Sequence, residues 1–344
     1  MSNATISSAT ISSATWQQFL ISQGAQFNAT GEAVFTTPAA PASGQLFDLS
    51  SHGLIAVSGA DALTFLQGQF TNDIKQLSQA AQFTGYCTAK GRLLALFYAF
   101  SINETIYLQC PRALIAALVK RLRMFVLRSK VVVEDASEQF VILGLASADS
   151  AAHIQHLPLH AHQYSQTPLG SLIRLPDSHG KQRAQLIVES AQAEAAWKTL
   201  AASFNPTDSE QWDTLEIQAG IPQVYTATQE QFVPQMLNLD ALDGINFKKG
   251  CYTGQEIVAR THYLGKVKRR TLLAALPETA VAPQVGDAVL DAKQQEAGQL
   301  VRVAANKQGG WWLLAECRLE ARAAGSIYWQ EYELAFAELP YTLA

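Results

Sequence analysis

Cysteine is scarce in this sequence, and no two cysteines have a spacing that suggests shared chemistry. The 344-residue chain has four, at Cys87, Cys110, Cys251 and Cys317. None forms a C-x-x-C pair, so neither a zinc ribbon nor a dithiol redox motif is indicated. Four widely separated thiols in a chain of this length are more typical of a reducing compartment than of a disulfide framework.

A strong excess of charge is also lacking, and so is a long apolar run. The formal net charge is −4, whereas a protein that coats nucleic acid is usually strongly basic. The longest apolar run, Leu93–Phe100, is too short to span a bilayer. Because the N-terminus has neither a basic segment nor a continuous apolar segment, no secretory signal is predicted. We therefore expect a cytoplasmic protein that does not enter a membrane.

The signatures of several common active sites are missing as well. The chain contains no P-loop and no G-x-G-x-x-G, G-x-S-x-G or H-E-x-x-H motif. Histidine is frequent in one stretch, at His153, His156, His160 and His162. A histidine-rich stretch can bind metal, but no carboxylate or thiol is spaced to complete a ligand set there. We expect a solvated surface at these histidines and no metal site.

The chain does contain enough apolar residues for a substantial core. Hydrophobic residues make up 48% of it and charged residues 16%, which is typical of a globular protein. From residue 45 onward, short apolar segments bounded by turn residues are mixed with amphipathic helical patterns. This mixture predicts an α+β fold with mostly antiparallel sheets and helices on one face.

The first residues differ in composition from the rest. Residues 1–44 predict a flexible tail, because the stretch ATISSAT occurs twice within residues 4–15 and carries no charge. A short helix is expected at 16–23, and residues 38–44 have the composition of a linker.

The remaining chain divides by pattern into further segments. Residues 45–135 predict the first part of an α+β domain, which residues 205–262 would complete, and residues 136–204 predict a second α+β domain. Residues 205–265 carry the densest motif. Residues 266–344 contain short alternating strands separated by turns and predict a small β-barrel.

Chemically capable side chains are densest in Gly244–Arg260, which has the sequence GINFKKGCYTGQEIVAR. Within it, Thr253 and Glu256 have the S/T-x-x-E spacing of a capping box. The spacing predicts a helix from Thr253 to about His262, with Gly265 just past its end.

This helix would place Cys251 and Tyr252 directly before its electropositive N-terminus, with Lys249 nearby. Such a setting favours the thiolate form of a cysteine. Gly250 and Gly254 flank the pair and would let another molecule approach closely. The residues alone leave an alternative open, in which Cys251 is a small buried residue at a helix entry.

The octapeptide KGCYTGQE at Lys249–Glu256, followed by Arg260, resembles the signature of the YgfZ family, which is related to the T-protein of the glycine cleavage system. The match extends from about Leu46 to Gly265 and leaves the N-terminal tail uncovered. Other segments that resemble family elements are Val57–Asp61, Phe65–Gln69, Thr71–Asp73, Ala89–Arg92, Gln218–Pro222, Phe232–Gln235 and Asn238–Leu239.

The resemblance implies a T-protein-like (GcvT-like) fold, in which two related α+β domains surround a central channel and a C-terminal barrel follows. It implies that tetrahydrofolate or another folate binds in the channel. It also implies that Cys251 is the functional thiol, with surroundings shaped by Lys249, Tyr252, Gln255, Glu256 and Arg260.

The resemblance further implies a contact between folate and the indole of Trp212. An indole offers a flat face and an N–H donor to a pterin, although the residue type alone fits a core aromatic equally well. His52 stands where some family members carry a second tryptophan, and a histidine ring can also stack or donate a hydrogen bond.

The function implied by the resemblance is that of a folate-binding accessory protein. Such a protein supports the assembly or repair of iron–sulfur enzymes, including one that methylthiolates tRNA. T-proteins carry an acidic residue in the strand after the turn that resembles Lys90-Gly91, whereas Leu93–Phe97 contains none. Since an aliphatic side chain cannot exchange a proton, we expect aminomethyl transfer to be lost. A tetrahydrofolate-dependent one-carbon transferase and a folate-sensing scaffold remain alternatives.

Two basic runs could contact an anion. One is Lys266–Arg270, and the other comprises Arg112, Lys120, Arg121, Arg123, Arg128 and Lys130. The anion could be a folate glutamate tail, an RNA phosphate or an acidic partner, and the simpler interpretation is a solvated surface. The negative net charge makes direct tRNA contact the weaker expectation.

Overall fold

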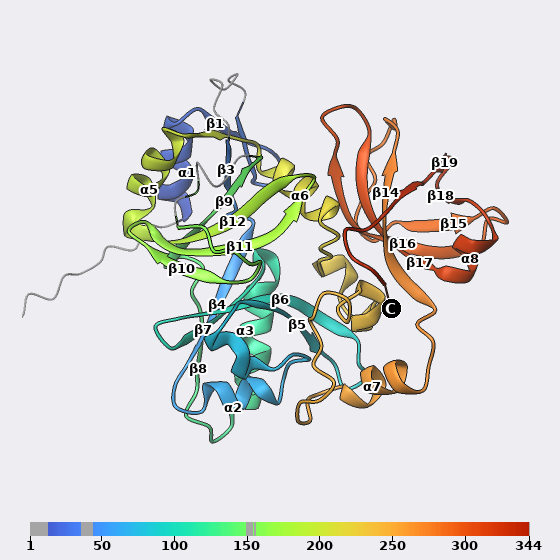
Figure 1. Ribbon diagram of the computed structural model, residues 1–344, viewed down its shortest axis with the longest axis horizontal. Coiled ribbons are helices and arrows are strands. Elements are labelled where there is room, and N and C mark those ends of the chain that lie inside the picture. The colour runs from blue at the N-terminus through green and yellow to red at the C-terminus, as the bar shows by residue number, and fades with distance from the viewer. Residues whose placement is uncertain (1–12, 36–43, 149–153, 155, 344) are drawn as a thin grey trace, which may run out of the picture. The chain divides into compact units, whose positions relative to one another are not determined.

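The chain forms two compact units, each built from two separate stretches of sequence. The computed structural model describes residues 13–35, 44–148, 154 and 156–343 (Figure 1). Unit 1 comprises Met1–Gly53 and Asp135–Ser209, and unit 2 comprises Leu54–Glu134 and Glu210–Ala344. The duplicated N-terminal stretch lies largely outside the described residues, as do His153 and most of the linker.

Unit 1 is organised around a six-stranded sheet. All neighbouring strands in it are antiparallel except β3 and β13, which are parallel. The strand order is β10 (Tyr164–Thr167), β11 (Gly170–Ser178), β12 (Lys181–Glu189), β9 (Phe140–Ser147), β3 (Gly44–Asp48) and β13 (Phe204–Pro206). The sequence groups β3 with residues 45–135, but β3 pairs with β9 in this sheet, where its buried residues complete the unit 1 core.

The helix expected near the N-terminus is present as α1 (Ser13–Ser22) and belongs to the unit 1 core. The indole of Trp16 lies 5.9 Å from that of Trp197 on α5 (Ala193–Ala201). Its Nε1 donates a 2.9 Å hydrogen bond to Asp48. A hairpin of β1 (Ala25–Phe27) and β2 (Ala33–Phe35) follows α1.

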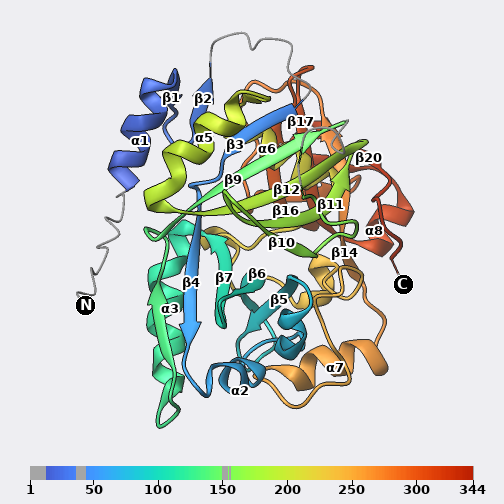
Figure 2. The same ribbon diagram turned by 60° about the vertical axis from the view of Figure 1, so that its left-hand side comes forward.

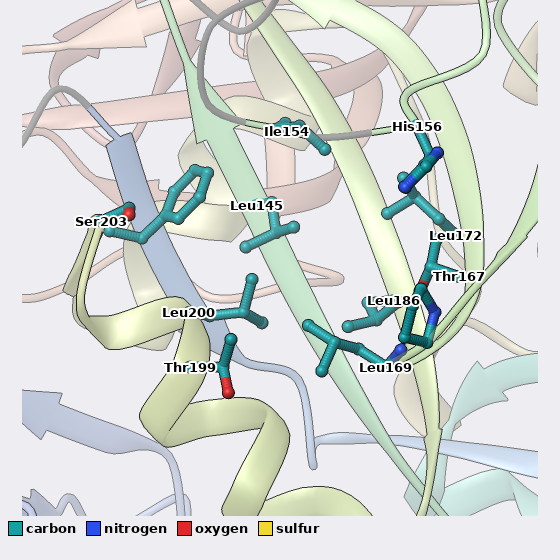
Figure 3. Close-up of a pocket in the computed structure, with 12 residues that line it drawn as sticks. Leu145, Ile154, His156, Thr167, Leu169, Leu172, Leu186, Thr199, Leu200 and Ser203 are labelled. Carbon is teal, nitrogen blue, oxygen red and sulfur yellow. The ribbon is translucent and has the colours of Figure 1, made fainter.

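A cavity of about 310 Å³ lies in unit 1 between the sheet and the end of α5 (Figure 3). Leucine is the commonest residue of its wall, with Leu145, Leu172 and Leu186 on the strands and Leu200 on the helix. All of its lining residues belong to unit 1, whereas the motif Gly244–Arg260 belongs to unit 2.

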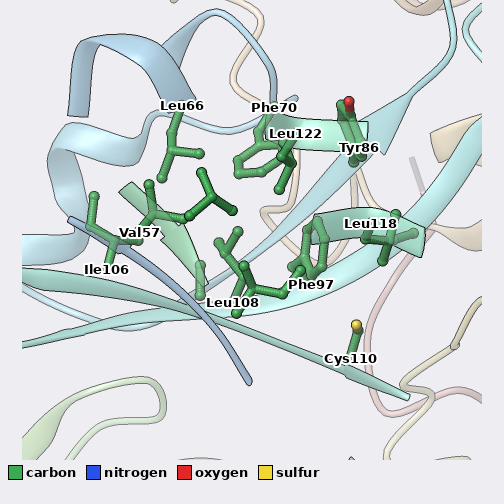
Figure 4. Close-up of a cluster of buried hydrophobic side chains, with 14 of the residues drawn as sticks. Val57, Leu66, Phe70, Tyr86, Phe97, Ile106, Leu108, Cys110, Leu118 and Leu122 are labelled. Carbon is green, nitrogen blue, oxygen red and sulfur yellow. The ribbon is translucent and has the colours of Figure 1, made fainter. Parts of the chain in front are cut away.

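Unit 2 begins with a five-stranded sheet. Helices α2 (Ala62–Gln67) and α3 (Arg112–Val126) pack against it through a shared apolar core (Figure 4). On α3 the buried residues Leu114, Leu118 and Leu122 recur every four positions, as expected for a helix that buries one face. The strand order is β5 (Gln82–Cys87), β6 (Leu93–Ile102), β7 (Thr105–Pro111), β4 (His52–Ser58) and β8 (Val132–Asp135).

The C-terminal part of unit 2 confirms the predicted barrel. Seven antiparallel strands curl into a nearly closed sheet, and the short helix α8 (Leu319–Ala324) follows β17 (Figure 1). The strand order is β19 (Tyr332–Glu333), β18 (Ile327–Trp329), β15 (Ala288–Asp291), β16 (Glu296–Ala305), β17 (Trp311–Arg318), β14 (Arg269–Leu276) and β20 (Ala335–Ala337).

In the described residues, helix α6 (Ser209–Gln218), helix α7 (Gln255–Tyr263) and four 3₁₀ turns are the remaining elements. The turns are η1 (Ile74–Ser78), η2 (Ser190–Gln192), η3 (Thr226–Thr228) and η4 (Pro234–Leu237). Mixed sheets and helices of this kind confirm the predicted α+β class. In the part of the chain that the structure describes, no helix is both long and apolar enough to cross a membrane.

Candidate functional site

The motif forms a loop, residues 244–254, followed by helix α7, both in unit 2. Figure 2 shows α7 near the hairpin of β5 and β6. Two segments of the same unit hold the motif. One is Thr71–Asp73, which follows α2, and the other is the turn Thr88–Arg92 between β5 and β6.

Lys249 ties the motif loop to the segment after α2. Its Nζ donates hydrogen bonds of 2.8, 2.6 and 2.8 Å to the backbone carbonyls of Gln67, Phe70 and Asn72. Burial lowers the pKa of Lys249 to about 8, although the charge of Asp73 acts in the opposite direction. Lys249 therefore positions the loop by its contacts with backbone.

The start of the motif loop is held by reciprocal hydrogen bonds. Thr71 Oγ1 donates to the carbonyl of Gly244 at 2.7 Å, and the Thr71 carbonyl accepts from the N–H of Asn246 at 3.0 Å. Asn72 Nδ2 donates to the carbonyl of Asp243 at 2.6 Å. The family-like segment Thr71–Asp73 thus acts as a support for the motif.

The turn between β5 and β6 meets the start of α7 at two glycines. Gly254 has φ +85°, and a Cβ there would lie 2.4 Å from the carbonyl oxygen of Thr88. Gly91 has φ +70°, and a Cβ there would lie 2.8 Å from Cβ of Ile257. Both positions therefore require glycine, for the left-handed backbone and for the close approach of the two segments.

The predicted capping box is wrong. Helix α7 begins at Gln255, and its N-cap is Gly254, which makes no side-chain cap. The left-handed turn at Gly254 brings the chain against Thr88 and leaves Thr253 outside the helix. The helix ends at Tyr263, close to the predicted end.

Cys251 is exposed, whereas the other three cysteines are buried. A Cβ added to the adjacent Gly250 would meet no atom within 4 Å, so space is open at that neighbouring residue. The alternative of a buried structural residue is therefore wrong for Cys251. The next side chain, Tyr252, is buried, which raises its pKa, and its ring lies 5.2 Å from Nζ of Lys249.

The remaining predicted site residues lie in the first turns of α7. Gln255 is half-buried, while Glu256 and Arg260 are exposed and four residues apart, hence on one face of the helix. Gln235 Nε2 donates a 2.7 Å hydrogen bond to the carbonyl of Val258 and so fixes α7 to an earlier segment of the chain. The structure brings these residues into one loop-to-helix turn. Their individual roles remain predictions.

The segment before the motif is also joined to the barrel. Arg270 on β14 pairs with both carboxylate oxygens of Asp240 at 2.5 and 2.9 Å and donates to the carbonyl of Gln235 at 3.0 Å. Asn238 Nδ2 donates to the carbonyl of Thr271 at 2.7 Å. Arg270 is therefore a structural residue of the predicted basic run.

Comparison with known proteins identifies the family. No family model matches the chain. The tRNA-modifying protein YgfZ of Yersinia pestis (strain Pestoides F) is 31% identical over 308 residues, which cover 87% of this chain and 93% of that protein. The tRNA-modifying protein YgfZ of Photobacterium profundum is 34% identical over 249 residues, 71% of this chain and 73% of the relative. The chain belongs to the YgfZ family.

The fold of this YgfZ-family chain resembles that of a solved aminomethyltransferase. The crystal structure of glycine cleavage system aminomethyltransferase T from Bartonella henselae matches 94% of this chain and 96% of that chain, with a TM-score of 0.72 and 16% identity. This likeness confirms the predicted GcvT-like fold and, at that identity, concerns the fold alone.

The two residues expected to contact folate in this YgfZ-family member lie in different units. Trp212 belongs to α6 in unit 2 and is 1% exposed. His52 belongs to unit 1, is half-buried, and has its Nδ1 3.4 Å from the hydroxyl of Ser51. Their contact with folate remains a prediction.

The sequence did not single out two buried acceptors in the same family-like segment. Gln235 Oε1 and Asn238 Oδ1 have no hydrogen-bond partner in the described structure, although both side chains are fully buried. Each amide donates its N–H to a carbonyl, which fixes the orientation of its oxygen. Unsatisfied buried acceptors are costly, and they suit the amino and ring N–H donors of a pterin.

Proposed function

We propose that this protein is a folate-binding accessory protein that supports the assembly or repair of iron–sulfur enzymes and thereby tRNA modification. The partner would be an iron–sulfur enzyme such as one that methylthiolates tRNA, in the cytoplasm. Membership in a family whose curated members are named tRNA-modifying proteins supports the link to tRNA. The observation that carries the proposal is the exposed Cys251 at the centre of an otherwise anchored motif loop.

Cys251 is exposed, whereas the residues around it, Lys249 and Tyr252, are partly or fully buried. A thiolate is a strong nucleophile and a soft metal ligand. Lys249 and Tyr252 hold the backbone on either side of the thiol, since one is bound to three carbonyls and the other is buried. Both act as positioning residues, while Gln255, Glu256 and Arg260 are available to contact a partner that approaches the thiol.

The proposed folate contact is Trp212, and the unsatisfied acceptors of Gln235 and Asn238 are further candidates for hydrogen bonds to a folate. The indole supplies a flat surface for a ring, and the two amide oxygens accept hydrogen bonds from a pterin. When bound, tetrahydrofolate supplies a carrier for one-carbon units.

A one-carbon transferase is the second candidate, because the fold resembles that of an aminomethyltransferase. Against it stands strand β6, whose first eight residues are all buried. Its start, Leu93–Phe97, is apolar and offers no carboxylate to exchange a proton. Turnover of an aminomethyl donor by the purified protein would favour this candidate over the accessory role.

The decisive experiment replaces the thiol in a bacterial strain that lacks its own YgfZ-family protein. Cys251→Ser should abolish restoration of methylthiolated tRNA, measured by mass spectrometry of tRNA nucleosides, while the unfolding midpoint of the variant stays unchanged. Cys110→Ala removes a buried thiol and serves as the matched control, which should restore modification. Full restoration by Cys251→Ser would remove the thiol from the mechanism.

Folate binding is tested separately by quenching of tryptophan fluorescence with tetrahydrofolate. Because the chain has six tryptophans, the comparison of variants is essential. Trp212→Phe should abolish most of the quenching. Trp329→Phe, a substitution in the barrel, should leave the quenching unchanged. Equal quenching in both variants would exclude Trp212 as the contact.

A further inference from the structure

Three aromatic rings gather where the motif loop meets the end of α7. The rings of Phe247 and His262 are stacked, with centroids 3.7 Å apart and planes inclined by 12°. The ring of Tyr263 meets both edge-on, at 6.1 Å from Phe247 and 4.7 Å from His262. Tyr263 is 64% exposed and the following Leu264 is 85% exposed. A contiguous exposed apolar surface, unlike single scattered side chains, is a feature of interaction sites.

The stack joins these rings to the motif. Phe247 precedes Cys251 by four residues, and His262 lies in the last turn of α7. Their contact therefore closes a loop that contains the thiol. The nine residues of α7 span roughly 13 Å, so the rings and the thiol occupy the two ends of one small structural element.

The same element carries an excess of exposed positive charge. Lys248, Arg260, Lys266 and Lys268 are all exposed, and Glu256 is the only acidic residue between 247 and 270. The other basic residues in this range are engaged elsewhere: Lys249 binds backbone carbonyls, Arg269 pairs with Glu316, and Arg270 pairs with Asp240. The local excess contrasts with the net charge of −4 for the whole chain.

We propose that this aromatic–basic surface, formed by Phe247, Lys248, Arg260, His262, Tyr263 and Lys266, binds a single-stranded segment of RNA. Unpaired bases stack on exposed aromatic rings, and Lys or Arg side chains beside the rings neutralise the phosphates. The paired bases of a duplex do not offer these faces, so single strands are favoured. The inference deepens the proposed function and rests on it, since it assigns an RNA partner to the surface that carries the motif thiol.

Binding is measured with a fluorescently labelled single-stranded RNA of about twelve nucleotides, a length within the usual range of single-strand sites, and with the duplex of the same sequence. The full-length protein should bind the single strand more tightly than the duplex. Tyr263→Ala should weaken binding of the single strand by roughly five-fold or more, the range expected for one lost stacking contact. Tyr263→Phe keeps the ring and should keep the affinity. Lys266→Gln should reduce the slope of log affinity against log salt by about 0.7.

The second basic run supplies a matched control for charge. Lys120 is exposed on α3, so Lys120→Glu and Lys266→Glu change the net charge equally, and only the second should weaken RNA binding strongly. The proposal is overturned by equal effects of these two variants, by an unchanged affinity of Tyr263→Ala, or by no binding of the RNA. Tyr263-dependent binding of a polyglutamate peptide in place of RNA would also overturn it and assign an acidic protein to the surface. These results do not depend on the tRNA modification assay of Cys251→Ser, so the two proposals can fail separately.

Discussion

At the scale of single residues, the environments of the four cysteines predict very different reactivities. Burial raises the pKa of Cys87 and of Cys317 to about 12, and Cys110 is fully buried. Cys251 is exposed. Because the thiolate is the reacting form, Ellman's reagent at about pH 8 should modify one thiol rapidly in the folded protein and the other three only after unfolding. Cys251→Ser should remove the rapid phase. A second rapid thiol would contradict the structure.

Lys249 should contribute to stability through its three bonds to backbone carbonyls. Lys249→Met leaves those carbonyls without their donor and should lower the free energy of unfolding by about 2 kcal/mol at pH 7. Burial lowers the folded-state pKa of Lys249 to about 8 from its usual 10.5. Between these values the unfolded chain binds more protons, so the stability contributed by Lys249 rises as the pH rises through this window.

The measurement is urea unfolding of wild type and Lys249→Met at pH 7 and pH 9.5. The stability difference between the two proteins should be larger at pH 9.5. Lys248→Met, at an exposed neighbour, is the control and should change neither value by more than about 0.5 kcal/mol. A difference that shrinks at pH 9.5 would show that the pKa of Lys249 is not lowered.

The sequence could indicate which residues matter at this scale but not how each is used. Lys249 and Tyr252 were expected to shape the surroundings of the thiol. The structure shows that Lys249 binds backbone carbonyls and that Tyr252 is buried, while their roles at the thiol stay predictions. The spacing of Thr253 and Glu256 suggested a cap that does not form. A local sequence pattern carries no information about the close contact between Gly254 and Thr88, which is distant in sequence. This contact requires the left-handed backbone of Gly254.

At the scale of elements, the junction between α7 and the hairpin of β5 and β6 depends on glycine. Gly254→Ala should lower the free energy of unfolding by at least about 2 kcal/mol, since a side chain at φ +85° is strained and its Cβ would lie 2.4 Å from a carbonyl oxygen. Gly250→Ala is the matched control, because a Cβ there meets nothing within 4 Å. Chemical denaturation of both variants tests the difference, and equal stabilities would show that the two segments separate readily.

At the scale of the whole molecule, the sequence could predict the fold class and the barrel. It could not predict which segments far apart in the chain contact one another. Alternating short strands after residue 266 are a local signal, and they form the seven-stranded sheet. The pairing of β3 with β9, and the bond from Thr71 to Gly244 across 173 positions, are long-range contacts without a local signature. Unit 2 is therefore complete only when its two stretches of sequence meet.

The C-terminal residues should stabilise unit 2 by joining the end of the chain to the segment before the motif. Tyr341 donates a 2.7 Å hydrogen bond to the carbonyl of Gly220, and its hydroxyl accepts from Asn238 Nδ2 at 3.3 Å. Tyr341→Phe removes both bonds and leaves the carbonyl of the buried Gly220 without this donor, so the free energy of unfolding should fall by about 1–2 kcal/mol.

The matched control is Tyr332→Phe in the barrel, where the ring stacks on Trp329 and should keep that contact without its hydroxyl. If the hydrogen bonds of Tyr341 support the segment before the motif, Tyr341→Phe should also increase the hydrogen exchange of the backbone N–H groups of Asn238 and Leu239. Tyr332→Phe should leave this exchange unchanged. If Tyr341→Phe changes neither the hydrogen exchange nor the free energy of unfolding, the hydrogen bonds of Tyr341 do not stabilise unit 2. Asn238 also donates a hydrogen bond to the carbonyl of Thr271 on β14. Loss of the Tyr341 hydrogen bonds should therefore make the segment around Asn238 more mobile, while its contact with the barrel is kept.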